Sequence, residues 1–182
     1  MSLKYYLESD NKSWQSQIKE YLKENNLHGI IIGGAALSVL SGSNKLPKDV
    51  DIVVDRPISS SFDMYDTLPL FKNNIKIDLI ELNKEIFLKD NYGSFTIKTQ
   101  NVENYKTING LKIINEYNLF LTAKNSETRE KIIKDLKLPF EYFKKFKDKN
   151  DKIKFVSSWI DANNISEKDE ELYINKFKEN VK

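Results

Sequence analysis

The chain has 182 residues and a net charge of +2, and 40% of its residues are hydrophobic and 31% charged. This balance is typical of one folded domain with a sizeable core and excludes a disordered chain. Because the sequence contains no cysteine, it also excludes a disulfide framework, a thiolate zinc site and a cysteine nucleophile. Residues 1–10 include acidic side chains where a signal peptide would be apolar, and the longest nearly apolar stretch, 29–40, is too short to span a bilayer. We therefore expect a cytoplasmic protein with no membrane partner.

The first part of the chain predicts strands and helices in turn. Apolar runs and period-two alternation predict four strands, at residues 29–32, 49–54, 74–82 and 94–100. Apolar residues at helical spacing predict one helix over 13–26 and a second from Ala35 to Leu40. Residues 58–73 are polar and aromatic, and they predict a loop or a short helix.

The rest of the chain predicts a hairpin followed by helices. Asn109 and Gly110 suit a type I′ turn, so residues 106–114 predict a β-hairpin. After this hairpin the apolar spacing is helical to the end, with aromatic stripes that we interpret as core. The predicted fold class is therefore α+β, a mixed sheet flanked by helices. We expect a core domain at 1–114 and a C-terminal helical region packed on it at 115–182.

Two glycines and three aspartates form the most informative pattern. Gly33 and Gly34 stand between the first predicted strand and a helix, where glycine lets the backbone approach a bound group and the helix N-terminus offers N–H donors to phosphate. Asp49 and Asp51 follow on a strand whose alternation puts both carboxylates on one face, and Asp78 lies at the centre of a later strand. Carboxylate oxygens suit Mg²⁺, which is usually held by one or two carboxylates and substrate phosphates. The pattern predicts a metal-assisted nucleotide site.

The order of these residues resembles the nucleotidyltransferase superfamily that includes DNA polymerase β. Its members have a Gly-Gly or Gly-Ser turn that opens a helix, an acidic-x-acidic strand, and a later acidic residue on a neighbouring strand. The Gly-Gly-x-Ala-Leu form, Gly33 to Leu37, looks most like the branch of the AbiEii-type abortive-infection toxins, and the similarity covers about residues 27–136. Many members have Ser or Thr where this chain has Ala35 and Ala36, so a hydroxyl that would hold the terminal phosphate is missing.

The resemblance implies a polymerase β-like fold and the transfer of a nucleoside monophosphate from a nucleoside triphosphate such as ATP, with two Mg²⁺ ions. The implied metal ligands and catalytic carboxylates are Asp49, Asp51 and Asp78. The implied nucleotide-binding residues are Gly33, Gly34, Ala35, Lys124 and Asp135. Lys124 is also expected to act in catalysis, at the leaving pyrophosphate. The alternative is that Lys124 is a helix-end cation and Asp135 an exposed helix residue.

Several interpretations of the acceptor and partners remain open. A toxin-like enzyme would modify RNA or a protein and have a cognate antitoxin, a second kind of enzyme would modify an antibiotic, and a degenerate member would bind only a nucleotide or a partner protein. The lysines of 144–154, interleaved with Phe143, Phe146 and Phe155, favour a solvated face over a strip that follows RNA. His28 is the single histidine, and the sequence has no serine-hydrolase motif in which it could act as the base. This disfavours serine-hydrolase chemistry.

Overall fold

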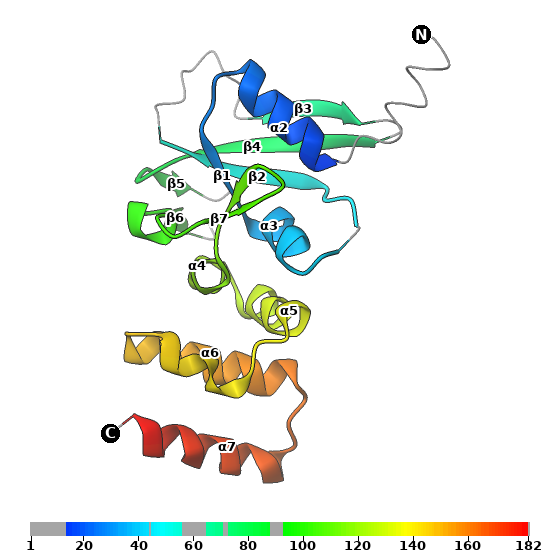
Figure 1. Cartoon of the computed structure of the whole chain (residues 1–182). Helices are drawn as coiled ribbons and strands as arrows, with labels where there is room; N and C mark the ends of the chain where they lie inside the picture. Colours follow the sequence, from blue (N-terminus) through cyan, green and yellow to red (C-terminus); the bar gives the residue numbers. More distant parts are fainter. Residues whose placement is uncertain (1–13, 44, 56–64, 71–72, 88–92, 182) are drawn as a thin grey trace. The chain divides into compact units, whose positions relative to one another are not determined.

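The structure is a computed structural model that describes residues 14–43, 45–55, 65–70, 73–87 and 93–181 (Figure 1). The chain divides into two compact units, Met1–Leu119 and Phe120–Lys182, and each is described by itself. The division falls within α4 (Glu116–Leu121). The predicted division between residues 114 and 115 lies slightly earlier in the chain.

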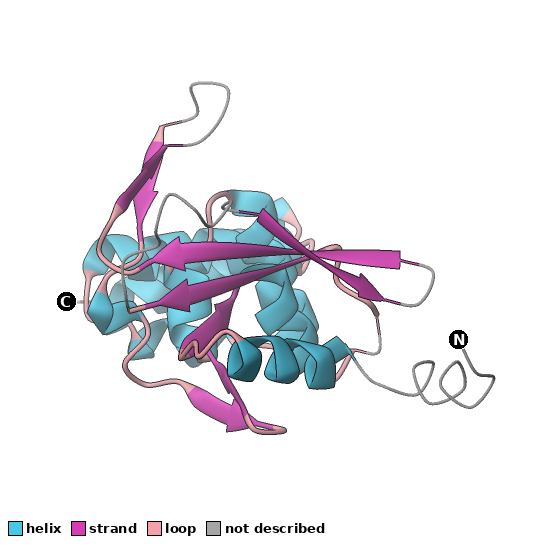
Figure 2. Cartoon of the chain, turned by 90° about the horizontal axis from the view of Figure 1, so that it is seen from above, coloured by secondary structure: helices cyan, strands magenta, loops and turns pink. Residues whose placement is uncertain are grey.

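A six-stranded mixed sheet is the centre of the described part of the first unit, in the order β3-β4-β2-β1-β8-β7. Its strands are β1 (Gly29–Ile32), β2 (Asp49–Val54), β3 (Tyr65–Leu70), β4 (Asn73–Glu81), β7 (Lys106–Ile108) and β8 (Leu111–Ile113). A separate ribbon of β5 (Glu85–Phe87) and β6 (Ser94–Thr96) projects from the sheet, as Figure 2 shows. The other elements are α2 (Trp14–Glu24), α3 (Gly33–Leu40) and the short 3₁₀ helix η2 (Thr99–Asn101). Helices and a mixed sheet together are the α+β class that the sequence predicts.

Different elements adjoin the two faces of the sheet at its centre. β1 pairs antiparallel with β2, so that Ile31 lies opposite Ile52 and Ile32 lies opposite Asp51. A Cβ atom on Gly29 would collide with Ile52 Cγ2 and lie 3.4 Å from Leu22 Cδ2 of α2. The face that carries Ile52 is therefore turned toward α2. The opposite face carries Asp51 and adjoins the start of α3.

The strands and the hairpin follow the sequence closely, with two corrections. β1 and β2 have the predicted bounds, and Asn109 and Gly110 have φ values of +52° and +78°, as a type I′ turn requires. The prediction of a loop or short helix at 58–73 is wrong for β3, while 58–64 and 71–72 lie outside the described residues. Pro69 disfavoured a strand in the sequence, but β3 is an edge strand, where proline is tolerated.

The second correction concerns helix and strand ends. α3 begins at Gly33 rather than Ala35, so both glycines belong to the first turn of the helix. The strand predicted over 94–100 is β6 and ends at Thr96. Within the described residues, no helix combines the length and the apolar character needed to cross a membrane.

The second unit is helical in its described part. Its elements are α5 (Ser126–Leu136), the 3₁₀ helix η3 (Phe140–Lys145), α6 (Lys149–Ala162) and α7 (Glu167–Asn180). Phe120, Phe146 and Phe155 form a buried cluster with ring centroids 5.3 to 5.5 Å apart, in tilted and edge-to-face arrangements. Phe140 and Phe143, three residues apart, are buried together from η3 because a 3₁₀ helix has three residues per turn.

The burial of these rings helps to decide whether the lysine-rich segment 144–154 could bind RNA or is a solvated face. Phe143, Phe146 and Phe155, which alternate with its lysines in the sequence, are all buried in the helical unit. RNA strands bind such segments partly by stacking bases on exposed aromatic rings. These three rings offer no such surface, and this favours the interpretation of the lysines as a solvated face.

Candidate metal and phosphate site

The register of the central strands puts the three predicted carboxylates on one face of the sheet. β2 and β4 run parallel, with Asp51 opposite Asp78 and Asp49 opposite Lys76. Residues that lie opposite each other on neighbouring strands share a face, and so do residues two apart on one strand. Asp49, Asp51 and Asp78 therefore share a face, which is the one that adjoins the start of α3.

The surroundings of Asp78 are those of an incompletely satisfied anion. Its side chain is 22% exposed, and its Oδ1 atom is buried and accepts no hydrogen bond from the residues that the structure describes. Lys76 Nζ lies 3.3 Å from this oxygen, so the two form an ion pair whose geometry is not that of a hydrogen bond. A buried carboxylate oxygen without a donor is costly. A further cation at this oxygen would lower that cost.

Lys76 was not among the residues predicted for the site. It stands two residues before Asp78 on β4, so strand alternation alone places it on the carboxylate face. The signal was therefore present in the sequence as a Lys-x-Asp pair on a predicted strand. Lys76 brings one positive charge to a face that carries three predicted carboxylates.

The donor set fits magnesium only in part. In the described stretches of the chain, no three His, Asp or Glu side chains are grouped closely enough to hold one metal ion. Mg²⁺ does not need such a group, because it commonly takes one or two carboxylates and completes its shell with water and substrate phosphate. Asp49, Asp51 and the buried oxygen of Asp78 are donors of the right chemical type. They suit ions that each take one or two of these carboxylates.

The glycine turn lies directly against one of the carboxylates. Gly33 has a φ of +64°, and a Cβ atom there would stand 2.9 Å from Asp51 Oδ2. Gly34 is exposed, and a Cβ atom there would meet nothing within 4 Å. Ile32, the N-cap of α3, provides no side-chain cap for the first N–H groups of the helix. The start of α3 therefore lies against Asp51 at Gly33 and has open space at Gly34, as a backbone phosphate site needs.

Ala35 points away from that open space. Its side chain is only 1% exposed and belongs to the core, as does that of Ala36. A Ser hydroxyl at position 35 would be buried rather than presented to a phosphate. Ala35 can contribute to the predicted site only through its backbone.

Lys124 and Asp135 belong to the second unit. Lys124 is exposed and lies after the end of α4, immediately before Asn125, whose side chain caps α5 by accepting a hydrogen bond from Thr128 N at 2.8 Å. Lys124 is therefore three residues beyond the end of α4, and the helix-end explanation stays an alternative. Asp135 is exposed in the last turn of α5. The roles predicted for both residues stay predictions.

The chain matches no protein-family model, no curated protein and no solved structure. Its resemblance to the nucleotidyltransferases therefore rests on the motif residues themselves.

Proposed function

We propose that the protein is a metal-dependent nucleotidyltransferase with a polymerase β-like core, which moves a nucleoside monophosphate from a nucleoside triphosphate to an acceptor hydroxyl. The observation that supports this most is the placement of Asp49, Asp51 and Asp78 on one sheet face, with the open start of α3 against Asp51. In a site for a magnesium–triphosphate complex, carboxylates bind the metal ion and the N–H groups at a helix start bind the phosphates.

Each part of the site has a distinct task in this reaction. Asp49, Asp51 and Asp78 would hold Mg²⁺, which supplies charge neutralisation to the phosphates and favours the ionised form of the attacking hydroxyl. Asp78 takes the proton of that hydroxyl. The hydroxyl oxygen forms a bond to the α-phosphorus while the bond to the β-phosphate oxygen breaks, and pyrophosphate leaves. Backbone N–H groups at Gly33 and Gly34 donate hydrogen bonds to the phosphate oxygens.

Titration of each nucleoside triphosphate with and without Mg²⁺ tests the proposal first. We expect binding that depends on Mg²⁺ and is lost in Asp51→Asn. Glu103→Gln is the matched control, because Glu103 is an exposed acid in the same unit that the site does not use. Equal loss of affinity in both variants, or binding that ignores Mg²⁺, would contradict a metal-dependent site.

The acceptor is proposed to be RNA or a protein, as in a toxin-like enzyme with an antitoxin. Incubation with labelled triphosphate and cell extract should place label in one of these two fractions, and expression should arrest growth. Label on a small molecule, or antibiotic resistance without growth arrest, would instead favour the antibiotic-modifying kind of enzyme.

A second candidate function is a nucleotide-binding protein that does not catalyse transfer. The Lys76–Asp78 ion pair favours it, because a lysine beside the carboxylate supplies positive charge without a metal. This candidate predicts triphosphate binding that is equal with and without Mg²⁺ and is weakened in Lys76→Met. The proposed enzyme predicts that Lys76→Met preserves or tightens Mg²⁺ binding.

A further inference from the structure

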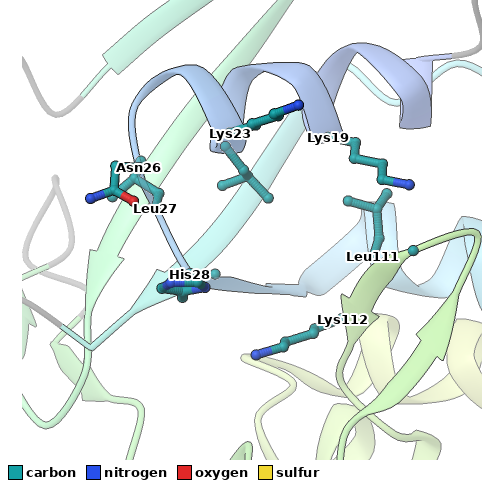
Figure 3. Close-up of a pocket in the computed structure, with 10 residues that line it drawn as sticks. Lys19, Lys23, Asn26, Leu27, His28, Leu111 and Lys112 are labelled. Atoms are coloured by element: carbon teal, nitrogen blue, oxygen red, sulfur yellow. The ribbon is translucent and has the colours of Figure 1, made fainter.

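A cavity of about 310 Å³ lies in the first unit, between α2, the start of β1 and the β7–β8 hairpin (Figure 3). Leu22, Leu27 and Leu111 give it an apolar lining, and all three are buried. The volume is at the lower end of the range for small-molecule sites. The cavity is therefore large enough for a ligand of about the size of one nucleotide.

Basic side chains surround this apolar lining. Lys19 and Lys23 come from α2, His28 from the residue just before β1, and Lys112 from β8, as Figure 3 shows. No Asp or Glu is among the described residues that line the cavity. The lining thus carries the three positive charges of its lysines. Such a lining selects an anion.

The surrounding structure holds two of these lysines in place. Lys19 extends along the hairpin turn, so that a Cβ atom on Gly110 would lie 2.9 Å from Lys19 Cε. Lys112 Nζ lies 5.1 Å from the ring centroid of Tyr105, which is a cation–π contact. Asn109 Nδ2 donates a hydrogen bond to Gln15 Oε1 at 2.9 Å and ties the turn to α2. The cavity is therefore built by packing between segments far apart in the sequence.

This cavity is separate from the carboxylate site. β1 begins at Gly29, which lines the cavity, and ends at Ile32, which lies opposite Asp51. The two sites are thus at opposite ends of β1. Gly29 also belongs to the sheet face turned toward α2, whereas Asp51 belongs to the other face.

We propose that this cavity binds a phosphate-bearing nucleotide unit, either as a free mononucleotide or as part of a single-stranded RNA. The exposed imidazole of His28 offers a ring for stacking on the base, and the lysines neutralise the phosphate. This second site goes beyond the proposed transfer reaction and does not depend on it.

The test uses His28 as a reporter. It is the only histidine in the chain, so the imidazole C–H signals of the tag-free protein need no assignment in a proton NMR spectrum. AMP, a short single-stranded RNA and polyglutamate are titrated in separate samples that contain EDTA, which removes metal-dependent binding at the carboxylate site. We expect the His28 signals to move with a nucleotide ligand and not with polyglutamate.

A shift with AMP identifies a free mononucleotide as sufficient, and a shift with RNA alone identifies a strand. The double variant Lys19→Ala/Lys112→Ala should abolish the AMP response, or reduce the slope of log RNA affinity against log salt concentration by about 1.4. Lys45→Ala/Lys131→Ala removes two exposed lysines that do not line the cavity and is the matched control. Melting curves of both variants verify folding.

Three results would overturn the proposal. An equal shift with polyglutamate would mean that the cavity recognises negative charge alone. RNA binding that leaves the His28 signals in place would locate the ligand elsewhere. An equal loss in the two double variants would mean that overall charge, and not this cavity, determines binding.

Discussion

Gly33 and Gly34 are adjacent in the sequence, yet the structure predicts opposite effects when each is replaced by alanine. In Gly33→Ala, a left-handed backbone at φ +64° costs about 1–2 kcal/mol. The new Cβ atom would also stand 2.9 Å from Asp51 Oδ2, so the carboxylate must move. In Gly34→Ala, the new Cβ atom enters open space, and alanine favours the helix by up to about 1 kcal/mol over glycine. The two variants should therefore differ by roughly 1–3 kcal/mol in the free energy of unfolding.

Urea unfolding of the two variants beside the parent protein measures this difference. Gly33→Ala should unfold at lower urea concentration than the parent, and Gly34→Ala at the same or higher concentration. For a chain of this size, each kcal/mol corresponds to about 2–4 °C in melting temperature, so thermal melts give a second measurement. Equal destabilisation by the two substitutions would refute the conformation assigned to the turn.

Triphosphate binding distinguishes a glycine turn that holds phosphate from one that only shapes the backbone. Gly34→Val places a branched side chain in the open space at the start of α3, and it should weaken triphosphate binding more than it lowers stability. Unchanged affinity in this variant would mean that the glycines form a turn and hold no phosphate.

Three other predictions concern single side chains. Asp51→Asn should abolish transfer and leave the melting temperature equal or higher, because it removes one charge from an acidic face; an unstable variant that is fully active per folded molecule would contradict the catalytic role. Lys124→Ala should lower turnover by roughly a hundredfold if it contacts the leaving pyrophosphate, and Lys124→Arg should restore part of it; normal turnover in Lys124→Ala removes the residue from the site. Lys176 donates a hydrogen bond to Glu141 at 3.0 Å and so lowers the pKa of that carboxyl. The resulting stabilisation is present above the ordinary pKa of Glu141 and is lost as the pH falls through the lowered value. In Lys176→Met the pKa of Glu141 should rise toward its ordinary value, and an unchanged NMR titration would contradict this.

Local patterns were sufficient to predict the central strands and the hairpin turn. The residues of β1 form an apolar run, and those of β2 begin with alternating polar and apolar side chains, and both patterns end clearly. The pair Asn109-Gly110 favours one type of turn. The alternation of β2 also places Asp49 and Asp51 on one face without knowledge of any neighbouring strand. The relation of Asp78 to them could be expected only in outline, because its register is set by pairing between β2 and β4.

Features that depend on distant contacts were not predictable from local pattern. The edge position of β3 makes Pro69 acceptable there, and no property of residues 58–73 themselves reveals that position. The basic cavity joins α2 to a hairpin that follows it much later in the chain, so its lysines are unremarkable until the fold brings them together. The spacing of Phe140 and Phe143 suited a 3₁₀ helix as well as an α-helix, and the structure has a 3₁₀ helix there.

The two edges of the six-stranded sheet bear on how this protein can associate with other chains. At one edge, β3 includes Pro69, which has no N–H group to offer to an added strand. At the other edge, β7 has only three residues and includes the exposed Lys106. Short edge strands, proline and lysine are the features by which natural sheets resist edge-to-edge aggregation. Neither edge of the six-stranded sheet therefore favours the addition of a strand from another chain.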